Sequence, residues 1–242
     1  MRKTSEPIRG ILFDKDGTLI DFRATWIPAY RASAEALAHA ANKPALAKEL
    51  LLAGGYDPDS GTLDPTSLLS CGTNDQIADR WSVVGQLDSA VDVRRTVRRI
   101  FYEHATRAPI PITDLGALFA RLKGRGIRLG VATSDSTDSA IAMLEAFSVR
   151  HLVDYVAGFD LGFGAKPDTG LVTGFCRKTG LTAGEIAVVG DTRHDLVMAA
   201  SAGVGLAVGV LSGVTGREGL ADLSDVILNS VAEIETVLAE VA

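Results

Sequence analysis

Short apolar runs alternate with stretches of helical spacing over most of this chain. The apolar runs, each typical of a buried strand, span residues 8–13, 127–132, 152–157, 186–189, 206–210 and 226–228. Apolar positions recur at the spacing of an amphipathic helix over residues 114–123, 139–147, 169–179, 194–202 and 231–242. Strands that alternate with helices predict βαβ units and a parallel sheet with helices on both faces. The pattern therefore predicts an α/β fold.

One long segment, residues 21–108, interrupts this alternation. It contains no convincing strand, and its helical patterns cover residues 24–41, 43–53, 73–81 and 91–104. A complete βαβ unit needs only about 30 residues. Thr133, which follows the second core strand, lies 117 positions beyond Asp16 (133 − 16). The surplus predicts an inserted helical domain at 21–108, with the α/β core formed by residues 1–20 and 109–242.

The composition is that of a globular protein with a sizeable core, because 47% of the residues are hydrophobic and 22% are charged. A net charge of −6 argues against a nucleic-acid partner, since phosphate backbones are bound by basic surfaces. The two cysteines lack the spacing of a metal or redox site. No apolar run is long enough for a signal peptide or a membrane span. We therefore expect a cytoplasmic protein without a membrane partner.

Two acidic pairs follow two of the predicted strands. Asp14 and Asp16 come after the first strand, and Asp191 and Asp195 come after the strand at 186–189. The carboxyl ends of parallel strands meet at one edge of a sheet, and carboxylates held close together need a positive partner. Such an oxygen-rich site suits Mg2+. Helix capping is the alternative for Asp191 or Asp195 taken singly. The presence of Asp14 and Asp16 at the end of another strand favours a metal site instead.

Three further features at the same sheet edge favour an anion such as phosphate. Thr133 and Ser134 follow the strand at 127–132, where a hydroxyl and successive backbone N–H groups can hold an anion. Lys166 lies in a glycine-rich loop, from which its charge could neutralise a phosphoryl group. Gly17 allows the backbone to turn sharply and to approach a ligand. Singly, these residues are more often caps, solvated lysines or ordinary turns.

Taken in order, these motifs resemble those of the haloacid dehalogenase (HAD) superfamily, and most closely its phosphatase branch of the phosphoglycolate phosphatase type. The four matching signatures are FDKDGT at 13–18, VATS at 131–134, AKPD at 165–168 and VVGDTRHD at 188–195. The resemblance covers nearly the whole chain. It implies a HAD-like core with a Rossmann-like parallel sheet, and an α-helical cap of the C1 type at 21–108.

The resemblance also implies a reaction. Asp14 would attack phosphorus and form an aspartyl-phosphate, while Asp16 would protonate the leaving oxygen and then activate water. Thr133 and Lys166 would offset the charge on the phosphoryl oxygens. The metal ligands implied for Mg2+ are Asp14, Asp16 through its main-chain carbonyl, Asp191, and Asp195 in support. An acid at position 16 is typical of members that act on phosphate esters or that move a phosphate within a sugar.

We therefore expect a Mg2+-dependent phosphatase for a small phosphorylated metabolite, either phosphoglycolate or a sugar phosphate. One alternative is a phosphosugar mutase of the same family, similar to β-phosphoglucomutase. Another is a non-catalytic module that binds phosphate or metal, although such a binder would not need Asp16 beside Asp14. The sequence determines neither the substrate nor the oligomeric state. A homodimer is one possible assembly.

Other polar clusters have simpler interpretations. The arginines within 94–99 share one helical face, which we interpret as a solvated surface. We expect Arg193 to form a local salt bridge, with a substrate carboxylate as its alternative partner. Residues 57–61 have two carboxylates at the spacing of a calcium loop, but the closing glutamate is absent, so we expect a turn. Thr73 or Asn74 is expected to cap a helix in the inserted segment, with substrate selection as its alternative role.

Overall fold

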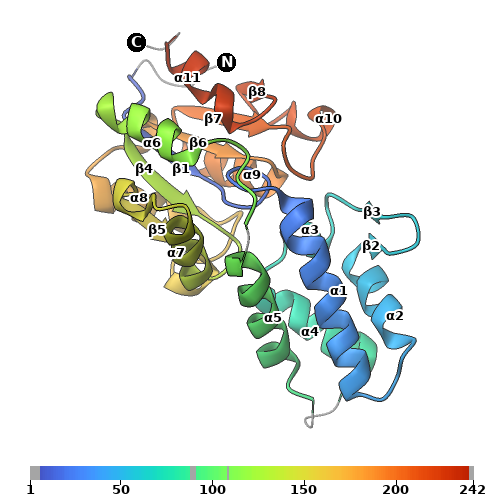
Figure 1. Cartoon of the computed structure of the whole chain (residues 1–242). Helices are drawn as coiled ribbons and strands as arrows, with labels where there is room; N and C mark the ends of the chain where they lie inside the picture. The colour runs from blue at the N-terminus through green and yellow to red at the C-terminus, as the bar shows by residue number, and fades with distance from the viewer. Residues whose placement is uncertain (1–5, 88–90, 108, 240–242) are drawn as a thin grey trace. The chain divides into compact units, whose positions relative to one another are not determined.

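Residues 6–87, 91–107 and 109–239 are described in the structure, a computed structural model of the chain (Figure 1). The chain divides into two compact units. The first consists of Met1–Phe22 together with Ile110–Ala242, and the second is Arg23–Pro109. Each unit has its own core and is described by itself below.

The first unit is built on a parallel sheet with the strand order β5-β4-β1-β6-β7-β8. Its strands are β1 (Gly10–Phe13), β4 (Arg128–Ala132), β5 (Tyr155–Ala157), β6 (Ile186–Gly190), β7 (Leu206–Val210) and β8 (Val226–Leu228). In the centre, Phe13 of β1 pairs in register with Val131 of β4 and with Val189 of β6. The α/β fold with a Rossmann-like parallel sheet, expected from the sequence, is confirmed.

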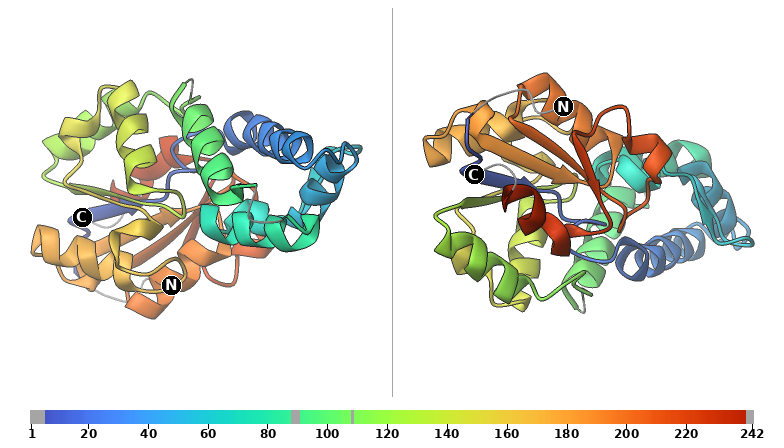
Figure 2. Two further views of the ribbon diagram at one scale, coloured as in Figure 1. Left: turned by 90° about the horizontal axis from the view of Figure 1, so that it is seen from below. Right: turned by 90° about the horizontal axis from the view of Figure 1, so that it is seen from above.

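Helices cover both faces of this sheet, as Figure 2 shows. They are α6 (Leu115–Gly124), α7 (Thr137–Ala146), α8 (Gly170–Thr179), α9 (Arg193–Ala202), α10 (Arg217–Leu220) and α11 (Ile234–Ala239). Single 3-10 turns lie at Arg150–Leu152, Phe159–Leu161, Ala183–Glu185 and Val231–Glu233. The β1 side chains alternate between the faces: Ile11 and Phe13 belong to one apolar cluster and Leu12 to the other. Phe13 also stacks on Phe119 of α6, with ring centroids 5.6 Å apart, which fixes the end of β1.

Polar side chains set where the core helices begin. Asp114 accepts a hydrogen bond from the N–H of Ala117 at the start of α6. Thr192 forms a capping box at the start of α9, in which its hydroxyl and its backbone N–H both contact Asp195 Oδ2. The capping role considered for Asp195 is therefore present, and this contact fixes one of its two carboxylate oxygens.

The second unit is mostly helical. Its elements are α1 (Phe22–Ala40), α2 (Leu46–Gly54), β2 (Tyr56–Asp57), β3 (Thr62–Leu63), α3 (Leu68–Cys71), α4 (Asn74–Gly85) and α5 (Val93–Arg107). The rings of Trp26, Tyr30 and Phe101 pack against one another with centroids 5.2–5.9 Å apart, and Trp81 is fully buried. These aromatic side chains give the unit a hydrophobic core of its own.

The expectation that this segment holds no strand is wrong, because β2 and β3 pair as a short antiparallel hairpin. The cause is local. The Asp57 carboxylate accepts hydrogen bonds from the N–H of Asp59 and from the Ser60 hydroxyl, and Gly61 has φ +71°. Residues 57–61 are thus the turn expected from the sequence, and they close a hairpin whose strands are too short to show alternation.

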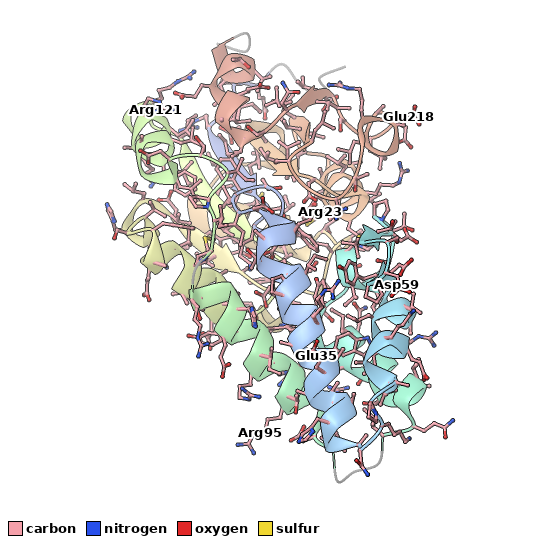
Figure 3. The ribbon with its side chains drawn as sticks, turned by 45° about the vertical axis from the view of Figure 1, so that its right-hand side comes forward. Arg23, Glu35, Asp59, Arg95, Arg121 and Glu218 are labelled. Atoms are coloured by element: carbon pink, nitrogen blue, oxygen red, sulfur yellow. The ribbon has the colours of Figure 1, made fainter. Side chains whose placement is uncertain are left out.

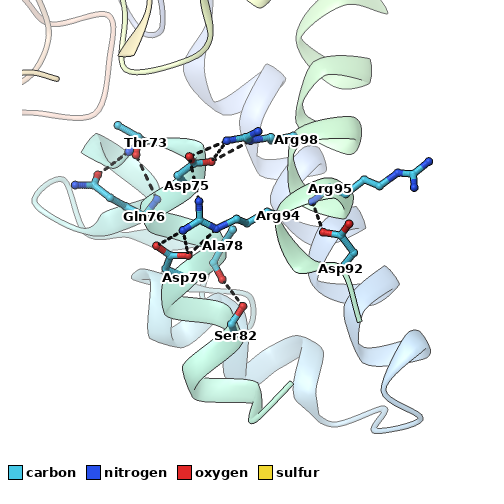
Figure 4. A network of polar contacts seen from close by, with 10 residues as sticks. All are labelled: Thr73, Asp75, Gln76, Ala78, Asp79, Ser82, Asp92, Arg94, Arg95 and Arg98. Carbon is cyan, nitrogen blue, oxygen red and sulfur yellow. Dashed lines mark hydrogen bonds and ion pairs between the residues drawn. The ribbon is translucent and has the colours of Figure 1, made fainter. Parts of the chain in front are cut away.

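The arginine face of α5 is exposed, as expected, and part of it is ion-paired with α4 (Figure 4). Arg94 contacts both oxygens of Asp79, and Arg98 contacts both oxygens of Asp75. Arg95 extends away from the helix (Figure 3). Thr73 caps α4 through a capping box with Gln76, so the capping interpretation of Thr73 is confirmed.

Candidate active site

Three neighbouring strands of the first unit bring polar residues to one edge of the sheet. Asp14 directly follows β1, Thr133 follows β4 and Asp191 follows β6. The Asp14 N–H still donates to the Val189 carbonyl at 2.8 Å, and the Thr133 N–H donates to the Ala157 carbonyl at 3.0 Å. The sheet ladder therefore fixes the backbone of the residues that carry the first two side chains.

Asp14, Asp191 and Asp195 form a buried carboxylate cluster. One carboxylate oxygen from each lies within 4.8 Å of the others. The Asp191 side chain is fully buried, and its Oδ2 accepts a hydrogen bond from the Val214 N–H at 2.9 Å. Its Oδ1 has no hydrogen-bond partner among the residues that the structure describes. The convergence of these three aspartates, expected from the strand ends, is present.

Lys166 lies directly against this cluster. Its Nζ is 2.5 Å from Asp14 Oδ1 and 2.5 Å from Asp195 Oδ1, and the lysine is buried. The residue comes from the loop that precedes α8, so the third sequence signature reaches the same place as the first and the fourth. An ammonium between two carboxylates satisfies part, but not all, of their negative charge.

The pKa values follow from burial and from the crowding of like charges. Burial raises the pKa of Asp14 to about 7, with Asp195 and Asp16 adding to the rise and Lys166 opposing it. Burial also raises the pKa of Asp191 well above its usual range, and Asp14 and Asp195 raise it further. Burial opposes the charge on Lys166, but its two carboxylate partners outweigh burial and raise the pKa of the lysine. The three carboxylates therefore carry more negative charge than the single ammonium of Lys166 offsets.

The cluster fits a magnesium ion. Carboxylate oxygens are the ligands that Mg2+ prefers, and Asp191 Oδ1 is a buried donor atom left for a cation. A divalent cation would also offset the repulsion that raises the pKa values of Asp14 and Asp191. Asp16 is not a member of this carboxylate cluster. Its main-chain carbonyl stays a predicted ligand.

The Asp16 side chain instead points to a second set of partners. Its Oδ1 accepts from Lys15 Nζ at 3.0 Å, and its Oδ2 accepts from the Thr133 hydroxyl at 3.4 Å. Lys15 in turn contacts Asp135 Oδ2 at 2.9 Å. Ser134, predicted to bind substrate, is half-buried between Thr133 and Asp135. Lys15 and Asp135 lie inside or beside the matching motifs, but neither was predicted from the sequence.

A loop after β7 closes one side of the carboxylate cluster. The Ser212 hydroxyl donates to the Gly17 carbonyl at 2.7 Å, and Gly17 has φ +85°. A Cβ atom on Gly17 would lie 2.6 Å from Asp191 Oδ2, and one on Gly213 would lie 1.8 Å from the same atom. The backbone therefore approaches Asp191 as closely as glycine permits. Gly213 and Val214 were missed, although their place after a strand end was a signal.

Arg193 does not contribute its charge to the cluster. Its guanidinium contacts the Asp222 carboxylate at 2.6 and 2.9 Å, and it donates to the Gly219 carbonyl. The expectation of a local salt bridge is confirmed.

Comparison with known proteins identifies the class. The family model of haloacid dehalogenase-like hydrolases matches residues 8–203, so this chain belongs to that family of hydrolases. The match includes every residue of the carboxylate cluster. The family and the enzyme class expected from the sequence are confirmed.

Individual relatives carry phosphatase names. The chain is 42% identical over 95 residues to "Probable phosphatase IndB" of Dickeya dadantii, a match that spans 39% of this chain and only 41% of that protein. It is 26% identical over 245 residues to phosphoglycolate phosphatase of Escherichia coli K12, covering 95% of this chain and 92% of the relative. A crystal structure described as a predicted phosphoglycolate phosphatase from Haemophilus somnus 129pt superposes with a TM-score of 0.70 at 22% identity, covering 97% of this chain and 99% of that one. At that identity the structural likeness supports the fold alone.

The helices of residues 6–87, 91–107 and 109–239 include none with both the length and the apolar character that crossing a bilayer requires.

Proposed function

We propose that this chain is a Mg2+-dependent phosphatase that hydrolyses a small phosphorylated metabolite, phosphoglycolate or a sugar phosphate, through an aspartyl-phosphate. The observation that carries the proposal is the buried group of Asp14, Asp191 and Asp195 with Lys166 against it. Such a site holds a nucleophile, ligands for a cation and a fixed positive charge at one point. The phosphatase names of the relatives point the same way.

In the first half-reaction, an Asp14 carboxylate oxygen attacks phosphorus as the bond between phosphorus and the ester oxygen breaks. The electron pair of that bond goes to the leaving oxygen, which takes a proton from the Asp16 carboxyl group. The products are an alcohol and a phosphoryl group bound to Asp14. Lys166 is held 2.5 Å from Asp14 Oδ1 and therefore lies near the phosphoryl oxygens as their charge develops.

In the second half-reaction, water attacks the phosphorus of the aspartyl-phosphate. The Asp16 carboxylate takes a proton from this water, and the bond between phosphorus and the Asp14 oxygen breaks. Inorganic phosphate leaves, and both aspartates return to their starting states. When bound at Asp14, Asp191 and Asp195, Mg2+ supplies positive charge that stabilises the phosphoryl oxygens.

We further propose that the unit Arg23–Pro109 is a cap of the C1 type that selects the substrate. Its place in the chain supports this role, because it is inserted between β1 and β4, shortly after the residues of the first signature. Its separate core of Trp26, Tyr30, Phe101 and Trp81 suits a unit that keeps its own shape.

The test is release of inorganic phosphate from a panel of phosphorylated metabolites, with Mg2+ and with EDTA. We expect Mg2+-dependent release that is lost in Asp14→Asn, while circular dichroism of the variant stays that of the wild type. Formation of an isomeric sugar phosphate without release of phosphate would instead favour a mutase. Binding of phosphate without turnover of any substrate would favour the non-catalytic module.

Two broader expectations stay proposals. Cell fractionation tests the cytoplasmic location, and light scattering in solution tests the homodimer.

A further inference from the structure

Lys15 is a charged residue of the site that takes no part in the reaction proposed above. It lies between Asp14 and Asp16 in the chain, and its side chain is 0% exposed. Lysine is almost never fully buried unless its charge is paired. Here Nζ donates to Asp16 Oδ1 at 3.0 Å and to Asp135 Oδ2 at 2.9 Å. The lysine thus joins a predicted catalytic residue to a carboxylate 120 positions away.

These contacts are part of a closed polar ring. From Asp135 the ring continues through its N–H, which donates to the Thr133 hydroxyl at 3.0 Å. The Thr133 hydroxyl completes the ring by donating to Asp16 Oδ2 at 3.4 Å. The Asp16 carboxyl group is therefore contacted on both oxygens, by Lys15 from its own loop and by Thr133 from the loop after β4.

Asp135 anchors the ring on the side away from Asp16. Its other oxygen, Oδ1, accepts from the Ser136 N–H at 2.7 Å. Burial opposes the charges of both partners, but mutual attraction outweighs it, raising the pKa of Lys15 and lowering that of Asp135. Lys15 and Asp135 thus form a fixed ion pair, and the lysine of this pair donates a hydrogen bond to Asp16.

Stability alone does not explain such a ring. An ion pair taken out of water often stabilises a fold no better than apolar side chains of similar volume. What the ring does provide is a fixed orientation of Asp16, because its two oxygens have different neighbours. Lys15 holds Oδ1 by the shorter, charge-assisted contact, whereas the Thr133 contact to Oδ2 is longer and involves a neutral group.

We propose that Lys15, anchored by Asp135, is a positioning residue that fixes the Asp16 carboxyl group so that Oδ2 exchanges the proton with the ester oxygen and later with water. This inference rests on the proposed phosphatase function. The balance of the reaction is unchanged: Oδ2 gives its proton to the leaving oxygen as the phosphorus–oxygen bond breaks, and it regains one from the attacking water.

The test uses leaving groups with different needs for a proton. Nitrophenolate leaves without protonation, whereas the alkoxide of a sugar phosphate or of phosphoglycolate needs a proton as it leaves. Water attack needs Asp16 for every substrate. The decisive quantity is therefore the rate constant of the first turnover, measured with enzyme in excess, and not the steady-state kcat.

The variants are Lys15→Met and the double variant Lys15→Met with Asp135→Asn. The double variant removes both charges, so it tests the inference even where the single variant, which takes the lysine partner away from the buried Asp135 carboxylate, fails to fold. Lys123→Met is the matched control, because this lysine also pairs with an aspartate, Asp154, but at the opposite ends of the strands. Circular dichroism and thermal melting check the fold of each variant.

For the double variant we expect the first turnover of the alkyl phosphate to slow by about 10–100-fold. The first release of nitrophenolate should stay within about threefold of the wild type, and Lys123→Met should change neither rate. Equal slowing of both first turnovers, or slowing of neither, overturns the inference while leaving the proposed function intact. A wild-type enzyme that releases no phosphate from any substrate overturns the proposed function, and this inference with it.

Discussion

Lys166 Nζ lies 2.5 Å from Asp14 Oδ1, although the two residues are 152 positions apart in the chain. The same nitrogen contacts Asp195, so one buried ammonium serves two buried carboxylates. Lys166 also lowers the pKa of the third carboxylate, Asp191, but burial, Asp14 and Asp195 outweigh the lysine and keep that pKa raised. The energetics of the site thus depend on one cation built into the chain and, in the proposed function, on a second cation bound from solution.

Removing the built-in cation should destabilise the fold as well as slow the reaction. Lys166→Met leaves Asp14 and Asp195 buried without their ammonium partner. Breaking a buried ion pair in this way costs about 3–5 kcal/mol, and we expect Mg2+ to recover part of that loss. Urea unfolding with EDTA and with Mg2+ measures both effects. A variant as stable as the wild type in EDTA would contradict the pairing.

The bound cation should matter more as the pH rises. The pKa of Asp14 is raised to about 7 in the folded chain, so folding favours the protonated carboxyl group. Without a cation, the stability that this residue contributes is therefore lost as the pH rises from about 4 to about 7. Mg2+ at about 100 times its Kd adds about 2.7 kcal/mol, and this gain should shrink at acidic pH, where protons compete for the carboxylates.

Thermal melting at about pH 5 and about pH 8, with Mg2+ and with EDTA, checks this expectation. Asp191→Asn serves as the control, because it removes one of the expected ligands and should lose most of the gain. A gain that is equal at both pH values, and that persists in Asp191→Asn, would exclude binding at the cluster.

The loop after β7 offers a test of how closely the backbone must approach Asp191. In Gly213→Ala the new Cβ would lie 1.8 Å from Asp191 Oδ2, so the carboxylate or the loop must move. We expect Mg2+-dependent activity to fall by about 10-fold or more, because misplaced catalytic groups lose rate steeply. Gly216→Ala is the matched control, since a Cβ there meets no atom within 4 Å. Similar activity in both variants would be the contrary result.

Asp154, a carboxylate remote from the cluster, should contribute to stability with the opposite dependence on pH. Burial alone would raise the pKa of Asp154, but Lys123, the Leu129 N–H and Arg128 outweigh it and hold the pKa below its usual range. Its contribution is therefore present above about pH 4 and lost as the pH falls through the lowered pKa.

Asp154→Asn should lower the free energy of unfolding by about 1–2 kcal/mol at neutral pH. The difference from the wild type should narrow near pH 3, in urea titrations at the two pH values. Asp59→Asn, which alters an exposed ion pair with Lys48, should leave the free energy of unfolding unchanged at both pH values. A difference for Asp154→Asn that is the same at both pH values would contradict the assignment.

Much of the fold could be predicted from the sequence, because buried parallel strands are continuous apolar runs. The runs at 206–210 and 226–228 coincide with β7 and β8. The run at 152–157 was too long, since its first residue ends a 3-10 turn and only Tyr155–Ala157 pairs with β4. The hairpin of β2 and β3 was missed because a strand of two residues has no detectable period.

The site was predictable where topology alone brings residues together. Asp14, Thr133 and Asp191 follow adjacent strands, so one rule about strand ends places all three. Lys15 and Asp135 could not be predicted, because a lysine in a sequence is ordinarily a solvated side chain. Only the fold shows that the partner of Lys15 comes from another loop. Close backbone approaches, such as that of Gly213, likewise exist only in three dimensions.

The central position of β1 has a consequence for how the enzyme is made. β1 leaves the ribosome before both of its neighbours in the sheet, which end at Ala132 and Gly190. The second neighbour is complete 177 positions after Phe13 (190 − 13), which is roughly 10–35 s of synthesis at about 5–20 residues per second. During that time β1 lacks its partner strands, and a nascent chain released before Gly190 lacks the end of β6 and Asp191, which follows it. Premature termination anywhere before Asp191 should therefore yield an inert product.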